Sequence, residues 1–188
     1  MIKRIKYFFL FITVVSLGLV WYFTTTPYYT LIRTFYAIKS NNVETFQYYC
    51  DVDSLSESLI DEILYLKTED LPKDLSVTIQ MMQADKSRNA FFKKLLAKGI
   101  KTQILKAIKQ NKWEENPNKK TEVGSIASLE NVLRGENHTV IKLDVKTKGE
   151  VLPLHFRLRK LEGHWKLVGI EQFGKLLIRV IQSQNAKR

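Results

Sequence analysis

The sequence predicts an α+β protein with an N-terminal transmembrane helix, and three observations support this class. An uncharged apolar stretch, Tyr7–Phe23, lies near the N-terminus. Segments whose apolar residues recur with helical spacing then follow as far as Lys112, and segments that alternate like strands occupy the last third of the chain. Helices first and an antiparallel meander afterwards are typical of the α+β layout.

Length and composition indicate one folded domain behind an anchor. The chain has 188 residues, of which 1–26 are assigned to the anchor and 27–188 to a single α+β domain of ordinary size. Apolar residues make up 45% of the chain, which excludes a disordered protein. Within the domain, residues 74–112 are expected to form a helical insertion.

The apolar stretch is expected to cross a membrane once. A helix from Tyr7 to Thr26 would span about 30 Å, which is the thickness of a bilayer core. Lys3, Arg4 and Lys6 precede the stretch, and no basic cluster directly follows it. By the positive-inside rule, the N-terminus then lies in the cytoplasm and residues 27–188 lie outside it.

A cleaved signal peptide is the alternative interpretation, because a basic segment and an apolar segment are both present. Trp21, Tyr22 and Phe23 are bulky, whereas a cleavage site requires small residues. The only cysteine is Cys50, so no cysteine directly follows the apolar run as it would in a lipoprotein. An uncleaved anchor is therefore favoured.

Five helices are predicted between Pro27 and Lys112. Pro27 suits the first turn of a helix, where its missing N–H would be unpaired anyway. Ser54-Leu55-Ser56-Glu57 has the pattern of a capping box and is expected to begin the third helix. The predicted segments are Tyr28–Ser40, Val43–Tyr49, a helix that starts within Asp51–Ser54, Asp74–Met82 and Asn89–Lys112.

Strands are predicted after a loop at Trp113–Lys120. Glycines at Lys148-Gly149-Glu150 and Glu162-Gly163-His164 indicate hairpin turns between neighbouring strands. Trp165 is expected to be buried in the last strand, against the first helix of the domain near Phe35. The extended segments are Thr121–Glu130, Thr139–Lys148, Glu150–Leu161 and Trp165–Ile170, and a short helix at Phe173–Gln182 is expected to close the fold.

Two sets of residues resemble known families. The helix after the anchor, the short helix before Asp51 and the closing run GHWKLVGI at 163–170 resemble the nuclear transport factor 2-like superfamily. More narrowly, TPYY at 26–29, Ala37–Lys39 and YCDVDSL at 49–55 look like an uncharacterised bacterial family of membrane-anchored proteins. The narrow likeness covers roughly residues 26–66, and the broader one adds 136–172.

The resemblance implies a cone in which a curved antiparallel sheet wraps the helices. It also implies a bacterial inner membrane with the domain on the extracytoplasmic, or periplasmic, side. This superfamily includes enzymes, ligand binders and interaction domains, so the fold alone implies no single activity. We expect a non-enzymatic interaction or accessory module of the cell envelope. The alternative is a small-molecule binder or enzyme that uses the mouth of the cone, with His155 and Arg157 as candidate lining residues.

No catalytic or cofactor-binding constellation is evident around the cysteine. Cys50 has no histidine near it in sequence, and the adjacent Asp51 would raise its pKa, so a buried structural cysteine is favoured over a nucleophile. Asp51-Val52-Asp53-Ser54 with Glu57 lacks the glycine and the third ligand of a calcium loop. We expect no cofactor at this segment.

The histidines do not indicate a metal site either. The spacing of His138, His155 and His164 matches no compact zinc motif, so solvated or hydrogen-bonded histidines are favoured. We therefore predict no bound metal.

The charge of the chain is concentrated in one helix. The net charge is +11, and residues 84–112 contribute +8 through nine Lys and Arg against Asp85. An apolar stripe of Phe92, Leu96, Ile100, Ile104 and Ile108 is expected to pack on the domain. The lysines on its other faces suggest contact with anionic lipid or an envelope polymer; a solvated lysine face is the alternative. Nucleic acid is not expected outside the cytoplasm. The candidate contact residues are Lys94, Lys98, Lys101 and Lys109.

Overall fold

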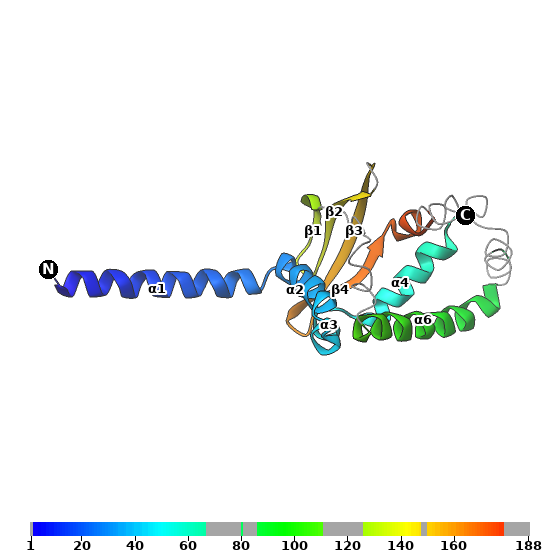
Figure 1. Cartoon of the computed structure of the whole chain (residues 1–188), viewed down its shortest axis with the longest axis horizontal. Helices are drawn as coiled ribbons and strands as arrows, with labels where there is room; N and C mark the ends of the chain where they lie inside the picture. Colours follow the sequence, from blue (N-terminus) through cyan, green and yellow to red (C-terminus); the bar gives the residue numbers. More distant parts are fainter. Residues whose placement is uncertain (1, 67–79, 81–85, 111–125, 148–149, 179–188) are drawn as a thin grey trace.

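The computed structural model confirms the α+β class, and it describes residues 2–66, 80, 86–110, 126–147 and 150–178. Figure 1 shows α1 leaving a body built from the other elements. The helices are α1 (Ile2–Thr24), α2 (Pro27–Lys39), α3 (Val43–Tyr49), α4 (Val52–Leu64) and α6 (Lys86–Lys109). The strands are β1 (Ile126–Arg134), β2 (His138–Thr147), β3 (Glu150–Leu161) and β4 (His164–Glu171).

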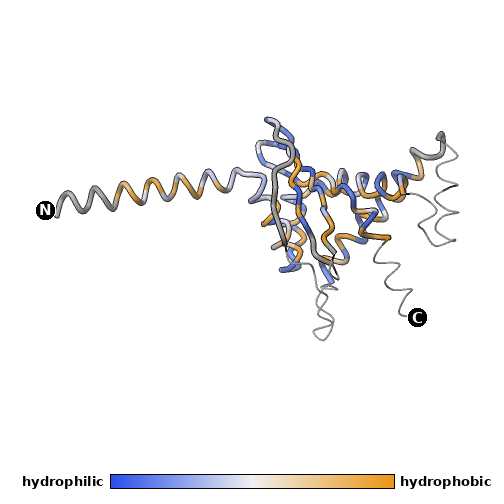
Figure 2. Tube along the Cα trace, turned by 90° about the horizontal axis from the view of Figure 1, so that it is seen from above, coloured by the Kyte–Doolittle hydropathy of each residue, from blue (hydrophilic) through white to orange (hydrophobic). Residues whose placement is uncertain are grey.

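α1 projects away from the body, and its apolar residues are exposed along the part whose side chains are described (Figure 2). Its last turn meets the body where the rings of Phe23 and Tyr29 pack edge to face, with centroids 5.8 Å apart. In the described part of the chain, no single helix has the length and hydropathy of a membrane span. The pair Leu10–Thr24 and Pro27–Lys39, bent by 73°, meets both criteria by length and composition alone.

The boundary between α2 and α3 follows from local chemistry. Pro27 occupies the first turn of α2, and the Thr26 hydroxyl caps it by accepting a hydrogen bond from the Tyr29 N–H. Asn41 then adopts a left-handed conformation with φ 56°, which ends the helix. The side chain of Asn42 accepts a hydrogen bond of 2.8 Å from the Thr45 N–H and so begins α3.

The start of α4 differs from the prediction. Asp51 is the N-cap, and its carboxylate accepts hydrogen bonds from both the N–H and the hydroxyl of Ser54. Ser54 is therefore already inside the helix, and the capping box predicted at Ser54–Glu57 is wrong. The helix begins earlier because the Asp51 N–H donates a hydrogen bond of 2.9 Å to the Leu167 carbonyl of β4. The chain enters α4 directly after this contact.

The sheet is an antiparallel meander in the order β1-β2-β3-β4. Ile141 of β2 pairs with Phe156 of β3, and Leu143 pairs with Leu154, so these four buried side chains lie on one face. The turn between β3 and β4 has positive φ at both Glu162 (53°) and Gly163 (85°). A two-residue turn with positive φ at both positions matches the twist of the two strands that it joins.

Helices cover the apolar face of the sheet. The rings of Phe35 on α2 and Phe156 on β3 pack edge to face at 5.7 Å. The Thr30 hydroxyl donates a hydrogen bond of 3.1 Å to the Trp165 carbonyl, so α2 also holds β4. Trp165 itself is only half-buried, which corrects the expected burial. The aromatic partner of Phe35 is Phe156, since the alternation of β3 directs that ring inward.

α6 lies antiparallel against α4. Asp53 pairs with Lys101 at 2.7 Å and Asp61 pairs with Lys93 at 2.8 Å, so both helices advance eight residues between the two contacts. Ala97, midway between the two lysines, is buried. In the first half of α6 the face toward α4 is thus Lys93, Ala97 and Lys101. Phe92 and Leu96 are exposed, so this half of the predicted apolar stripe is wrong.

The second half of α6 agrees better with the predicted stripe. Ile108 is buried in the main core, and Ile100 and Ile104 are half-buried against it. Of the other predicted segments, the loop at Trp113–Lys120 and residues 148–149 of the first turn lie outside the described residues. The predicted helix Asp74–Met82 also lies outside them, apart from Gln80. Residues 173–178 are helical, as expected for the start of the closing helix.

Candidate functional site

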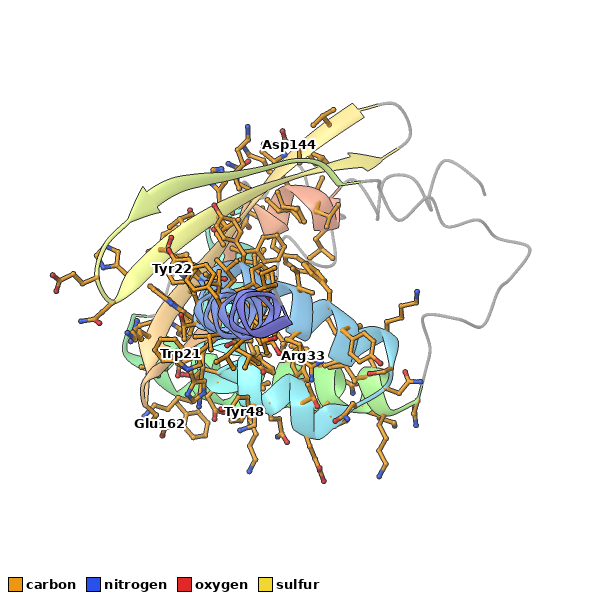
Figure 3. The ribbon with its side chains drawn as sticks, turned by 90° about the vertical axis from the view of Figure 1, so that its left-hand side faces the viewer. Trp21, Tyr22, Arg33, Tyr48, Asp144 and Glu162 are labelled. Atoms are coloured by element: carbon orange, nitrogen blue, oxygen red, sulfur yellow. The ribbon has the colours of Figure 1, made fainter. Side chains whose placement is uncertain are left out.

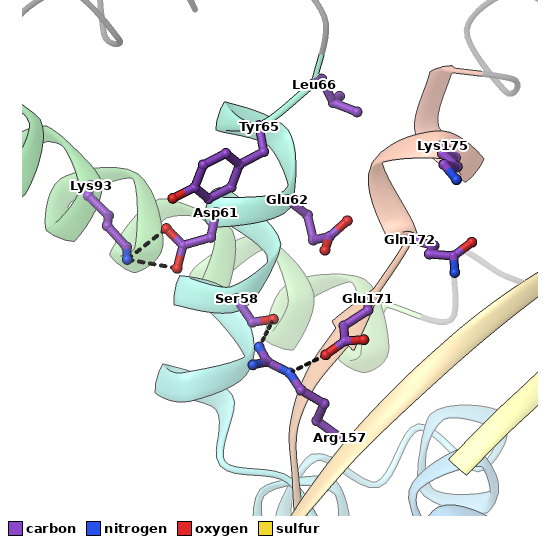
Figure 4. A pocket seen from close by; sticks show the side chains of 10 residues that line it. All are labelled: Ser58, Asp61, Glu62, Tyr65, Leu66, Lys93, Arg157, Glu171, Gln172 and Lys175. Atoms are coloured by element: carbon purple, nitrogen blue, oxygen red, sulfur yellow. Dashed lines mark hydrogen bonds and ion pairs between the residues drawn. The ribbon is translucent and has the colours of Figure 1, made fainter. Parts of the chain in front are cut away.

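A polar pocket of about 670 Å³ lies where α4, α6 and the end of β4 meet (Figure 4). α4 lines one side, and β3, β4 and the turn after β4 line the other. The lining residues are Ser58, Asp61, Glu62, Tyr65, Leu66, Lys93, Arg157, Glu171, Gln172 and Lys175.

Arg157 holds a central position in this pocket. It alternates with the buried Phe156 and Leu158, so its side chain leaves the opposite face of the sheet. Its Nη2 donates a hydrogen bond of 2.7 Å to the Ser58 hydroxyl of α4, and its Nε lies 3.5 Å from a Glu171 carboxylate oxygen of β4. The guanidinium thereby joins a helix to the neighbouring strand.

Gly169 provides the space for this arrangement. It pairs with Arg157 across β3 and β4. A Cβ at this position would lie 2.6 Å from both the Arg157 Nη2 and the Ser58 Oγ. Glycine leaves the guanidinium and the hydroxyl in their positions, and a larger residue would require these side-chain ends to move.

Four more charged groups line the pocket. Lys93 of α6 pairs with Asp61 of α4, as Figure 4 shows. Among the described residues, Glu62 and Lys175 have no ion pair. With Arg157 and Glu171, the lining carries three cations and three carboxylates. The balance favours a small ligand that is polar, or that carries both charges, over a strongly anionic one.

His155 lies beside this pocket on the same face of β3 as Arg157. Its Nδ1 is 3.7 Å from a Glu171 oxygen, so both residues share one carboxylate. Of the two candidate lining residues, the structure places Arg157 in the pocket and His155 next to it.

Ser58 has no neighbouring base in this pocket that would make its hydroxyl a nucleophile. The Ser58 hydroxyl accepts a hydrogen bond from Arg157, and none of the lining residues is a histidine that would activate it. Within the described residues, no group of His, Cys, Asp or Glu is placed to hold a metal ion.

Cys50 lies apart from the polar pocket. It is 1% exposed and belongs to the main core, where its backbone bridges Leu167 of β4. Burial, with a smaller contribution from the Asp51 carboxylate, raises the pKa of the Cys50 thiol. The thiol is therefore held neutral, which is unsuited to nucleophilic attack.

The four candidate lysines of α6 separate into two groups. Lys94, Lys98 and Lys109 are exposed, whereas the Lys101 Nζ is bound to the Asp53 carboxylate at 2.7 Å. Lys101 therefore faces α4, which corrects its assignment to the free basic face. Exposed apolar residues accompany the free lysines in the first half of α6: Phe91, Phe92, Leu95 and Leu96.

Most of the pocket has no signature in the sequence. Ser58, Asp61, Lys93, Glu171 and Lys175 come from four segments whose approach is a tertiary property. One signal was present: Gly169 interrupts the apolar run of the last strand, and a glycine within a strand often marks close approach of another group.

Comparison of the chain with protein-family models, with curated proteins and with solved structures finds no match.

Proposed function

We propose that this chain is a single-pass, membrane-anchored extracytoplasmic domain that serves as a non-enzymatic interaction module at a bacterial cell envelope. The observation that carries the proposal is the exposure of α1. Its apolar side chains face outward along the described length, and Trp21 near its end is 72% exposed. Such a surface requires an apolar environment, and a bilayer supplies one around the whole helix.

The direction of insertion is proposed from charge. Lys3, Arg4 and Lys6 precede the apolar stretch, which places the N-terminus in the cytoplasm and the body outside. A reporter that is active only outside the cytoplasm should work when fused after Arg188. Activity of a cytoplasmic reporter alone at that position would reverse the topology. A mature N-terminus near Thr24 would replace the anchor with a signal peptide.

The nuclear transport factor 2-like resemblance forms part of this proposal. Helices packed on an antiparallel meander support it, as does the half-buried Trp165 of the closing strand against the core. Membership of a membrane-anchored bacterial family would suit the same location. These family assignments rest on short motifs and on the fold class.

A second candidate function is binding of a small polar ligand in the pocket around Arg157. The specific observation is that Arg157 is fixed by Ser58 and Glu171, while Glu62 and Lys175 line the same pocket without an ion pair. A thermal-shift screen of amino acids and short peptides tests this candidate. A hit should be lost in Arg157→Ala and Lys175→Gln and kept in Lys160→Gln, which lies outside the lining.

A third candidate is contact of α6 with anionic lipid or an envelope polymer. The exposed lysines Lys94 and Lys98 lie beside exposed Phe91 and Leu95, which is the composition of an interfacial helix. Figure 1 shows α6 on the part of the body remote from α1, so the geometry favours a surface other than the membrane that α1 enters.

A further inference from the structure

The face of the body from which α1 leaves carries a cluster of aromatic residues around one arginine, separate from the Arg157 pocket. Figure 3 looks along α1 and shows Arg33 of α2 and Tyr48 of α3 on this face. Ring contacts run without a break from the end of α1 across it: Phe23 to Tyr29 at 5.8 Å, Tyr29 to Tyr49 at 6.0 Å, and Tyr49 to Tyr48 at 4.9 Å.

Arg33 is the charged member of this cluster, and it lacks an anionic partner. Its guanidinium carbon lies 5.5 Å from the Tyr36 ring centroid and 5.8 Å from that of Tyr49. Among the residues that the structure describes, no carboxylate lies within ion-pair distance of it, and its buried Nε has no hydrogen-bond acceptor. A cation held between rings retains N–H groups at its edge, which fit the paired oxygens of a phosphate.

Tyr49 adds a phenol to the same site. Burial, together with the Tyr29 hydroxyl, raises the pKa of the Tyr49 phenol, while Arg33 opposes this rise. The phenol therefore stays neutral near pH 7 and does not neutralise Arg33.

The rest of this face has the composition of a membrane interface. Ile32, Tyr36 and Tyr48 are 54%, 58% and 55% exposed, and the rings carry hydroxyls. α2 is bent by 73° from α1, so if α1 follows the bilayer normal, α2 lies close to the bilayer plane. Because this face lies where α1 leaves the body, the surface next to it would be the headgroup layer of the membrane that α1 enters.

We propose that this face, defined by Ile32, Arg33, Tyr36 and Tyr48, docks on the headgroup layer of the membrane that α1 enters, with Arg33 binding a phospholipid phosphate. The proposal rests on the anchor proposed above. Docking would fix the orientation of the body relative to the bilayer and direct the Arg157 pocket and the exposed half of α6 away from it.

The first measurement separates the anchor from the docking. The full chain is reconstituted in nanodiscs of phosphatidylethanolamine and phosphatidylglycerol, and its incorporation is read from co-elution with the discs and resistance to alkaline carbonate. A chain that stays out of the discs contradicts the anchor, and the docking with it. An incorporated chain supports the anchor and allows the docking to be judged separately.

Docking is then read from quenching by nitroxides on the lipid headgroups. A fluorophore is placed at Ile32→Cys in a Cys50→Val background, and in a second sample at Tyr65→Cys, an exposed position at the end of α4. Quenching at position 32 should exceed that at position 65 by at least about twofold, since headgroups would lie against α2. Equal quenching in an incorporated chain overturns the docking alone.

The role of Arg33 has a matched control in Lys39, which is exposed at the end of the same helix. Arg33→Gln should reduce the quenching at position 32 by at least about twofold, and Lys39→Gln should leave it nearly unchanged. Of the two residues, only Arg33 has a guanidinium held between the Tyr36 and Tyr49 rings. Equal effects of the two variants contradict the assignment. If Arg33→Gln does not fold, Arg33→Lys keeps the charge and removes the planar guanidinium that can bind two phosphate oxygens. Reduced quenching at position 32 in that variant supports the proposal.

The phosphate is tested by changing the lipid. In discs of a neutral galactolipid, which has no phosphorus, Arg33→Gln and the unmodified chain should give the same quenching. A difference as large as that in phospholipid would overturn phosphate as the group that Arg33 binds.

Discussion

Ser58 on α4 and Arg157 on β3 are 99 residues apart in sequence, yet the Arg157 Nη2 donates a hydrogen bond of 2.7 Å to the Ser58 hydroxyl. The contact exists because Gly169 lies between strand and helix without a side chain. It joins the helical half of the body to the sheet and supports one wall of the polar pocket. Because Arg157 also lies 3.5 Å from Glu171, its guanidinium is held in the pocket from two sides.

Gly169→Ala should destabilise the body by about 0.5–1.5 kcal/mol, because its methyl group would displace the guanidinium and break its hydrogen bond to Ser58. Chemical denaturation measures the free energy of unfolding. Gly99→Ala is the matched control: nothing lies within 4 Å of a Cβ there, and Gly99 is an exposed position within α6. It should stabilise by about 0.5–1 kcal/mol. Equal effects of the two substitutions would contradict the tight approach.

Asp51→Ala should cost about 0.5–2 kcal/mol, because it removes the carboxylate that caps α4. Thermal and urea unfolding measure the loss. Glu57→Gln is the control, since the capping-box prediction assigns Glu57 a role and the structure places the cap at Asp51. A loss from Glu57→Gln as large as that from Asp51→Ala would restore the capping-box interpretation.

The stability of the body should fall with rising pH because of Cys50. Its pKa is raised in the folded state, so the folded chain keeps the proton that the unfolded chain loses above about pH 8.5. The stabilisation is fully present below that pH and is lost above it, with a slope of up to about 1.4 kcal/mol per pH unit.

Cys50→Val removes this thiol while keeping an apolar side chain in the core. The difference between the two unfolding free energies should stay constant from pH 7 to pH 8 and shift in favour of the valine variant at higher pH. Parallel pH profiles would mean that the thiol is not held neutral by burial.

The free lysines of α6 should control any preference for anionic vesicles. In the fragment 27–188 the body is released from α1 and can present α6 to any surface. Lys94→Gln with Lys98→Gln should weaken sedimentation with anionic vesicles, and added salt should do the same, since exposed charges are screened over about 8 Å at physiological ionic strength.

The control for this experiment removes the same charge from the other face of α6. Lys93→Gln with Lys101→Gln deletes the two lysines that pair with Asp61 and Asp53, and it should leave the preference largely intact. Equal sedimentation of the unmodified fragment with neutral and anionic vesicles would leave α6 with a solvated lysine face.

Local patterns in the sequence were sufficient for several element boundaries, although not for the start of α4 or the bounds of β1. Pro27 marked the start of α2, Asn41-Asn42 its end, and Glu162-Gly163 the last hairpin, because each depends on the conformational preferences of one or two residues. The alternation in β2 and β3 was also sufficient for the inward face of the sheet, since the period of two follows from strand geometry. Whether α1 crosses a membrane remains a prediction from the apolar stretch and its flanking charges.

Tertiary structure decided how those elements face one another. The sequence predicts an apolar stripe on α6, but Lys93 pairs with Asp61 of α4 and Lys101 pairs with Asp53. A charged face therefore turns inward and Phe92 turns outward. The cap at Asp51 depends on its hydrogen bond to Leu167 more than a hundred residues later. The pocket around Arg157 likewise requires Ser58, Gly169 and Glu171 to meet. Such registers are set by long-range packing, and the periodicity of a single segment carries no information about the segment that will lie against it.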